Sequence, residues 1–215
     1  MLVMMKAVLW DFGGVILTSP FEAFRHYETQ HDLPVDFIRS VNAANPHGNA
    51  WALMERNEIA ADRFDELFAI ESAALGHRVH GADVLSLLNG DVRPDMVEML
   101  DRVAAAGLRN ACLTNNIVDR GVDRGLAGQT RADQIAAIMD RFDVIVESSK
   151  VGVRKPEPRF YEIACELLDV RPAECAFLDD LGINLKPAAA MGMTTIKVTS
   201  ASQAIADLSA ALGWT

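Results

Sequence analysis

Five short apolar runs recur along this chain, and each of them ends at a small, polar or acidic residue. The runs are AVLW (7–10), NACL (110–113), DVIV (143–146), CAFL (175–178) and TTIKV (194–198). Segments with the apolar spacing of helices separate the last four runs, at 117–140, 157–168 and 184–191. Strands that alternate with helices form parallel sheets that are covered on both faces, so their residues are continuously apolar. The pattern predicts an α/β fold built on a doubly wound parallel sheet.

The long stretch between the first two runs has a different character. Residues 18–90 show helical spacing without a clear buried strand, and residues 93–107 predict a further helix that starts near a proline and stops at a glycine. We expect residues 1–17 and 91–215 to form the α/β core. Residues 18–90 would then form a small helical cap, inserted after the first strand and lying over the carboxyl edge of the sheet.

Composition and charge exclude several classes of function. Hydrophobic residues make up 50% of the 215 residues, mean hydropathy is +0.12, and the formal net charge is −10 with the Lys and Arg residues scattered. Such a distribution lacks the basic patch that binds nucleic acid or an anionic membrane. No apolar run is long enough to span a bilayer. The three cysteines have no metal-ligand spacing, which favours buried, reduced thiols. Because the N-terminus lacks the order of a signal peptide, we expect a cytoplasmic protein.

Polar side chains gather where the predicted strands end. In open α/β sheets, the functional crevice lies outside the carboxyl ends of the strands. The residues at or just past these ends are Asp11, Thr114, Asn115, Lys155, Asp179 and Asp180. Each residue type has a simpler explanation when taken alone, because an acid before glycines forms turns and Thr and Asn cap helices. Together they predict one site.

The combination of residue types at this edge is typical of phosphoryl transfer. Three converging carboxylates repel one another unless a cation lies among them, and hard oxygen ligands with room for water suit Mg²⁺. A hydroxyl, an amide and a lysine are donors that suit the oxygens of a phosphate. A carboxylate can also act as the nucleophile and form an aspartyl-phosphate. The sequence therefore favours attack by Asp11 on a small phosphorylated substrate, with a metal between carboxylate and phosphate.

Four motifs, in this order along the chain, resemble those of the haloacid dehalogenase superfamily. They are the first strand with Asp11-Phe-Gly-Gly-Val, Leu-Thr114-Asn, Lys155-Pro-Glu-Pro and Leu-Asp179-Asp180. The runs 142–164 and 176–198 are most similar to the N-terminal phosphatase domain of soluble epoxide hydrolases and to the leader domain of acyl-CoA dehydrogenase family members. The likeness covers nearly the whole chain and is weakest in the cap. It implies a Rossmann-like core, but not epoxide hydrolysis, because these residues do not include the α/β-hydrolase half of those enzymes.

The resemblance implies a role for each residue of the phosphate site. Asp11 would be the nucleophile. Thr114 and Asn115 would bind the transferring phosphoryl group, and Lys155 would offset the charge between Asp11 and the phosphate. We therefore expect Asp11, Thr114 and Lys155 to be the catalytic residues of a hydrolase.

The same resemblance implies a metal site with Mg²⁺ as the cofactor. Asp11 and Asp180 would hold the ion, the latter directly or through water, and the backbone carbonyl of Gly13 would be a further ligand. Asp179 would orient the motif lysine or a metal-bound water. Asn184 would be a polar contact behind these groups.

Gly13 departs from the usual phosphatase pattern of this family. Phosphatases of the family usually carry an Asp there, which protonates the leaving oxygen and then activates water. The loss of a positioned general acid typically costs about 10² to 10⁴ in rate. Because the metal ligands are retained, the sequence favours a slow or selective phosphatase. Two alternatives stay open: a non-catalytic module that binds a phosphometabolite or a protein, and a metal-independent 2-haloacid dehalogenase, although such enzymes typically lack the acidic pair at 179–180.

Overall fold

A computed structural model describes residues 4–88, 90–116 and 125–214, and within them five strands form an all-parallel sheet. The strands are β1 (Ala7–Trp10), β2 (Arg109–Thr114), β3 (Val144–Glu147), β4 (Cys175–Asp179) and β5 (Thr194–Lys197). Their spatial order is β3-β2-β1-β4-β5, with every neighbouring pair parallel. The predicted doubly wound α/β fold is therefore confirmed.

The register of the sheet brings the ends of its central strands level. Trp10 in β1 pairs with Cys112 in β2 and with Leu178 in β4. Asp11, the next residue, donates its backbone N–H to the Leu178 carbonyl at 2.9 Å. Because parallel strands share one carboxyl edge, Asp11 lies beside the ends of both neighbouring strands.

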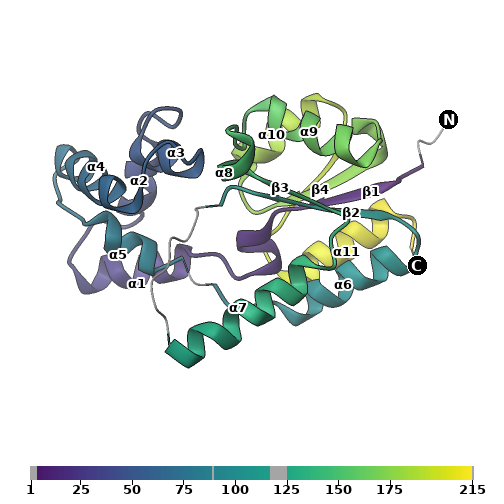
Figure 1. Cartoon of the computed structure of the whole chain (residues 1–215), viewed down its shortest axis with the longest axis horizontal. Coiled ribbons are helices and arrows are strands. Elements are labelled where there is room, and N and C mark those ends of the chain that lie inside the picture. Colours follow the sequence, from purple (N-terminus) through teal and green to yellow (C-terminus); the bar gives the residue numbers. More distant parts are fainter. Residues whose placement is uncertain (1–3, 89, 117–124, 215) are drawn as a thin grey trace.

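Helices cover both faces of the sheet, which gives the core three layers (Figure 1). The helices on one face are α9 (Pro158–Leu168) and α10 (Gly182–Ala190), and those on the other are α6 (Pro94–Ala105) and α11 (Ala201–Ala211). Successive side chains of β1 point to opposite faces. Val8 and Trp10 pack on the side of α6 and α11, whereas Ala7 and Leu9 pack on the other side. All four are fully buried, which explains the continuous apolar run.

The predicted helices of the core agree with the structure where it describes them. Those at 93–107, 157–168 and 184–191 correspond to α6, α9 and α10. The end of α6 is marked by Gly107, which has a positive φ of 80°. Within 117–140, α7 runs from Gly125 to Met139, and residues 117–124 lie outside the described part of the chain.

The described elements between 18 and 90 are helices and turns only. The helices are α1 (Phe21–Gln30), α2 (Phe37–Ala43), α3 (Ala50–Glu55), α4 (Ala61–Ala74) and α5 (Gly81–Ser86). They pack around an apolar cluster of their own, which includes Phe24, Phe64 and Phe68. Figure 1 shows this group beyond the carboxyl ends of the strands. We refer to helices α1–α5 as the cap.

Two linkers join the cap to the core and lie against each other. Leu17 and Val92 form an antiparallel bridge. The Thr18 backbone N–H donates to the Asp91 carbonyl at 2.8 Å. The chain thus leaves the core and returns to it at adjacent points.

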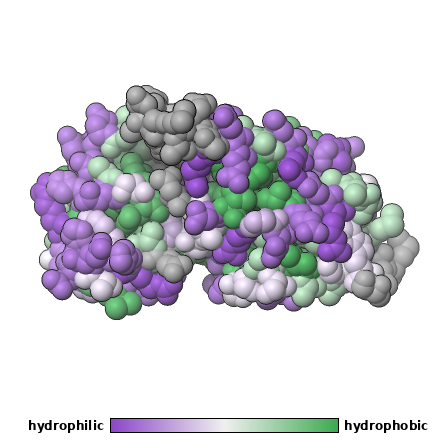
Figure 2. Space-filling model, turned by 90° about the horizontal axis from the view of Figure 1, so that it is seen from below, coloured by the Kyte–Doolittle hydropathy of each residue, from purple (hydrophilic) through white to green (hydrophobic). Residues whose placement is uncertain are grey.

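The surface is largely hydrophilic on the face drawn in Figure 2. An indentation separates the cap from the core at one edge of this view. Within the described ranges, no helix combines the length and the apolar character that a membrane span needs.

Candidate active site

The turn after β1 fixes one oxygen of Asp11. Residues Phe12–Ile16 form a tight turn, in which the Leu17 N–H donates to the Phe12 carbonyl at 2.9 Å. Asp11 Oδ1 accepts the backbone N–H of Phe12 at 2.7 Å. Asp11 Oδ2 takes part in none of the described hydrogen bonds, and the residue keeps 8% exposure. One carboxylate oxygen is therefore anchored and the other is available.

The ammonium of Lys155 lies between two carboxylates. Its Nζ is 2.8 Å from Asp11 Oδ1 and 2.8 Å from Asp179 Oδ2, and the side chain is 1% exposed. Burial works against the charge of the lysine, but the carboxylates of Asp11 and Asp179 outweigh burial and hold its pKa above the usual value. Lys155 is therefore a fixed positive charge beside Asp11.

Asp179 is fully buried at the end of β4, and protein donors occupy both of its oxygens. Oδ1 accepts the Leu181 backbone N–H at 2.8 Å, and the side-chain amide of Asn184 lies 3.1 Å from both oxygens. Oδ2 also accepts a hydrogen bond from Lys155. The structure thus brings Asn184 and Lys155 into direct contact with Asp179.

Asp180 packs against the turn that follows β1. Ser19 Oγ donates to Asp180 Oδ2 at 3.0 Å. A Cβ atom on Gly14 would lie 2.3 Å from the same oxygen, so a glycine leaves the room that this carboxylate needs. Gly14 also has a φ of 82°, a conformation that side chains disfavour.

Asp11, Asp179 and Asp180 form an acidic cluster, with one oxygen from each within 4.8 Å of the others. Burial raises the pKa of Asp11 well above its usual value, and the lysine opposes this effect while the two other carboxylates add to it. Burial and the charge of Asp179 likewise raise the pKa of Asp180. The cluster thus holds three carboxylates, and the ammonium of Lys155 pairs with Asp11 and Asp179. This set of hard oxygen donors fits a divalent cation such as Mg²⁺.

Thr114 ends β2 and Asn115 follows it at the same edge of the sheet. Thr114 is 8% exposed, and its hydroxyl takes part in none of the described hydrogen bonds. The Asn115 side chain is fully engaged, because Oδ1 accepts the Lys155 N–H and Nδ2 donates to the Lys155 carbonyl, both at 2.9 Å. Nδ2 also lies 3.3 Å from Glu55 Oε2 in the cap. The amide of Asn115 thus holds the main chain of Lys155.

Gly13 leaves the position beside Asp11 open. Its φ of −73° and ψ of 128° are accessible to any residue. A Cβ atom there would have no other atom within 4 Å, and the residue is exposed between buried neighbours. The backbone therefore does not require glycine at this position.

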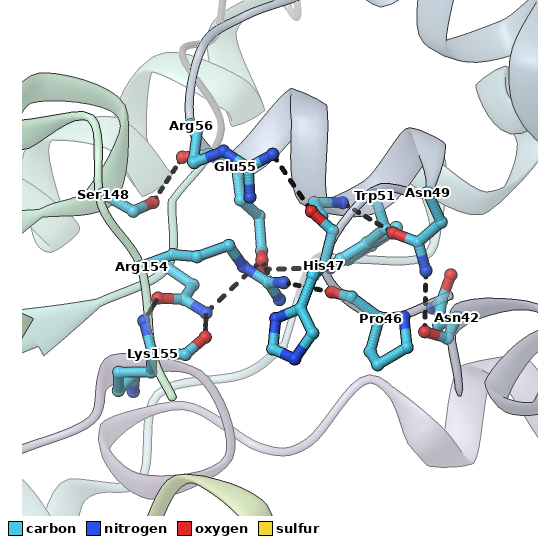
Figure 3. Close-up of polar contacts among 12 residues, drawn as sticks. Asn42, Pro46, His47, Asn49, Trp51, Glu55, Arg56, Ser148, Arg154 and Lys155 are labelled. Carbon is cyan, nitrogen blue, oxygen red and sulfur yellow. Dashed lines mark hydrogen bonds and ion pairs between the residues drawn. The ribbon is translucent and has the colours of Figure 1, made fainter. Parts of the chain in front are cut away.

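The structure adds residues that the sequence analysis did not single out. Arg154, directly before Lys155, forms an ion pair with Glu55 at the end of α3 (Figure 3). Ser19, in the linker to the cap, reaches Asp180. A signal for the ion pair was available, because Glu55 is the one acid in the apolar segment AWALME and a buried charge needs a partner.

Curated relatives resemble this chain over nearly its whole length. Acyl-CoA dehydrogenase family member 10 of Mus musculus is 32% identical over 216 residues, which cover 97% of this chain and 19% of that protein. Bifunctional epoxide hydrolase 2 of Mus musculus is 30% identical over 221 residues, which cover 97% of this chain and 39% of that protein. The chain therefore spans less than half the length of either relative.

A solved structure and a family profile agree with these relatives. The HAD family enzyme BT-2542 of Bacteroides thetaiotaomicron, in complex with magnesium and inorganic phosphate, shares the fold with a TM-score of 0.57 at 17% identity, over 90% of this chain and 93% of that one. The profile of the haloacid dehalogenase-like hydrolases matches residues 5–192. The resemblance drawn from the four motifs is thus confirmed, and this protein belongs to the haloacid dehalogenase-like hydrolases.

Proposed function

We propose that this hydrolase is a Mg²⁺-dependent phosphatase that acts on a small phosphorylated substrate and forms an aspartyl-phosphate on Asp11. The observation that carries the proposal is the state of the Asp11 carboxylate. Its Oδ1 is held by Phe12 and Lys155, whereas Oδ2 is engaged by no described donor. A nucleophile needs an oriented oxygen that is free to attack, with a fixed positive charge nearby. Asp11 has both.

The first step that we propose is attack by Asp11 Oδ2 on the phosphorus of the substrate. A bond forms between this oxygen and phosphorus, and the bond from phosphorus to the leaving oxygen breaks. The ammonium of Lys155, the hydroxyl of Thr114 and the backbone N–H of Asn115 would offset charge on the transferring phosphoryl oxygens. These groups lie on strand ends and short connections of a rigid sheet, which favours accurate placement.

Asp11 and Asp180, with the backbone carbonyl of Gly13, are the groups that we propose for Mg²⁺. A bound ion would neutralise the repulsion among the carboxylates and polarise the phosphoryl group. Support comes from the three clustered carboxylates and from the magnesium and phosphate in the complex of BT-2542. Asp179 is committed to donors of the protein, so we assign it to holding Lys155.

The second step that we propose is attack by water on the phosphorus of the aspartyl-phosphate. The bond between phosphorus and Asp11 Oδ2 breaks, which releases orthophosphate and restores the carboxylate. The leaving oxygen of the first step needs a proton, and the attacking water has to lose one. Gly13 offers no side chain for either transfer, so solvent water has to supply the first proton and take up the second. We therefore propose a slow or selective enzyme that favours sugar 1-phosphates or acyl phosphates, whose leaving oxygens need little protonation.

The cysteines support a cytoplasmic location. Cys112, Cys165 and Cys175 are free and buried. Proteins of reducing compartments keep their thiols in this form. We therefore propose that the enzyme acts in the cytoplasm on a soluble metabolite.

A screen of phosphorylated metabolites with and without Mg²⁺ tests the proposed function. We expect release of orthophosphate that disappears in EDTA and returns when Mg²⁺ is added in excess. Chelator-resistant turnover of a 2-haloacid would instead identify a dehalogenase, because halide leaves without a proton or a metal. Mg²⁺-dependent binding of phosphate without turnover of any ester would favour a non-catalytic binding module.

A further inference from the structure

We propose that Glu55 of the cap is a positioning residue for the phosphate-binding edge of the core. The proposal rests on the phosphatase function proposed above. Glu55 holds Asn115, and Asn115 holds Lys155, so these core residues reach their working geometry when the cap is seated.

The contacts of Glu55 tie the end of α3 to the core. Glu55 is 5% exposed although it carries a carboxylate. Trp51 Nε1 donates to Oε1 at 2.9 Å, Asn115 Nδ2 lies 3.3 Å from Oε2, and Arg154 forms an ion pair with Oε2. Trp51 belongs to the cap and Arg154 to the core (Figure 3), and Asn115 follows β2 of the core. Because a buried carboxylate needs donors to replace its lost water, the seated position of α3 depends on these core residues.

Asn115 connects the cap to Lys155, because its side chain bonds to both. Its Oδ1 and Nδ2 bond to the backbone N–H and carbonyl of Lys155, each at 2.9 Å. Lys155 Nζ in turn lies 2.8 Å from both Asp11 and Asp179. An unbroken series of polar contacts therefore leads from α3 to the nucleophile.

A second connection starts from the main chain of the same cap residue. Ser148 Oγ donates to the Glu55 carbonyl at 2.6 Å and accepts the N–H of Asn116 at 3.1 Å. Arg154 adds a further contact between core and cap. Its side chain donates a hydrogen bond of 2.9 Å to the Pro46 carbonyl, in the loop before α3 (Figure 3). Both the side chain and the main chain of Glu55 are thus tied to the segment that follows β2.

The same contacts argue against Glu55 as the missing general acid. Both oxygens of Glu55 already accept hydrogen bonds from N–H donors, so a proton on either oxygen would displace one of these donors. Burial raises the pKa of Glu55 above its usual value, and Arg154 and the Trp51 N–H offset this effect only in part. The role that the geometry points to is positioning, exerted through Asn115.

The first test compares Glu55→Ala with Glu58→Ala in the whole protein, with Mg²⁺ and p-nitrophenyl phosphate. Glu58 lies just after α3 and pairs with Arg56 inside the cap, so its removal takes away the same charge without a described contact to the core. We expect Glu55→Ala to lower kcat/KM by about 10- to 100-fold, because a small misplacement of a catalytic group has a cost of this order. Glu58→Ala should change it by less than about twofold. Equal losses in the two variants would overturn the proposal.

A double-mutant cycle separates positioning from a general loss of stability. If Glu55 acts through Asn115, then Glu55→Ala costs little in an Asn115→Ala background, and the two effects on kcat are far from additive. Additive effects would overturn the proposal. Thermal unfolding shows which variants stay folded. Should Glu55→Ala unfold, Glu55→Gln keeps the size of the side chain and removes the charge, and the same cycle applies.

Hydrogen exchange gives a readout that does not depend on turnover. We expect the amides of residues 114–116 and 153–155 to exchange faster in Glu55→Ala than in the wild type, and to be unchanged in Glu58→Ala. If the wild type hydrolyses no phosphate ester, the proposed function fails, whereas the exchange result still decides the role of Glu55. Unchanged exchange at both segments in Glu55→Ala would contradict that role.

Discussion

The carboxylate of Asp180 fills the space that a side chain on Gly14 would need, since a Cβ atom on Gly14 would lie 2.3 Å from Asp180 Oδ2 and 2.4 Å from Asp180 Cγ. The backbone of the turn after β1 therefore packs directly against the carboxylate of Asp180, which follows β4. Gly14 also has a φ of 82°, whereas Gly13 has an ordinary backbone. Of the two glycines after Asp11, Gly14 is the one that the geometry of the site requires.

We expect Gly14→Ala to weaken Mg²⁺ binding. The methyl group would displace Asp180, and disturbing the groups around a metal ligand typically lowers metal affinity by about 10- to 100-fold. The left-handed backbone adds about 1–2 kcal/mol of strain, which lowers the stability of the fold. Calorimetric titration with Mg²⁺ measures the change. Gly13→Ala is the matched control, because its Cβ meets no atom within 4 Å. Equal Mg²⁺ affinities in the two variants would remove Asp180 from the metal site.

We expect Gly13→Asp to raise turnover of alkyl phosphates, because it restores a carboxylic acid beside the nucleophile. The gain should be at most the usual contribution of one general acid, on the order of 10², and much smaller for p-nitrophenyl phosphate or acetyl phosphate. Steady-state rates on the two classes of substrate measure the pattern. The open space at Gly13 means that the variant should fold.

Gly13→Ala is again the control, because it adds a Cβ without an acid. It should leave both classes of substrate unchanged. If Gly13→Asp binds Mg²⁺ and improves neither class, the missing acid is not what limits the enzyme.

We expect Asp11→Asn to abolish turnover while the protein stays folded. An amide cannot form the acyl phosphate, although its oxygen can still accept the hydrogen bonds from Phe12 and Lys155 that now hold Oδ1. Rates with the best substrate of the screen and circular dichroism check the two parts of the expectation. Wild-type turnover in Asp11→Asn would rule out the covalent route.

We expect both tyrosines of the chain to stay protonated at pH 10.5, where a free tyrosine is largely ionised. Partial burial and the hydrogen bond to Asp83 raise the pKa of Tyr27 to about 12, and burial raises that of Tyr161. Because these pKa values are raised above those of the unfolded chain, the stabilisation is fully present below about pH 10 and is lost as the pH rises towards 12. Absorbance near 295 nm follows the ionisation, and a midpoint near pH 10 in the folded protein would contradict it.

The carboxyl edge of the sheet could be predicted, because parallel strands are buried on both faces. A strand covered on both faces is a continuous apolar run, so its end is visible where a polar residue interrupts the run. Asp11 and Asp179 are such residues, and the parallel topology brings them together. The end of α6 could be predicted for a similar local reason, since Gly107 takes up a backbone conformation that ends helices.

The junction between cap and core could not be predicted in the same way. Glu55 lies in a short apolar helix, and its burial depends on Arg154 and Asn115, which are remote in the sequence. A charge pair across an interface leaves no periodic signal in either segment. The orientation of the Asn115 amide is hidden for the same reason, because its partners are the main-chain atoms of Lys155, which every residue possesses.

The bridge between Leu17 and Val92 bears on how enzymes of this architecture diversify. Thr18 and Asp91 are joined by two hydrogen bonds of 2.8 Å, one from each backbone N–H, so the path of the chain closes on itself before the cap begins. A substitute segment of another length could start and end there without moving a strand, and each doubling of loop length costs only about 0.6 kcal/mol of closure entropy. Recognition surfaces could thus be exchanged by recombination while the chemistry is inherited intact. What a transplanted segment would have to bring is a carboxylate where Glu55 now meets Asn115.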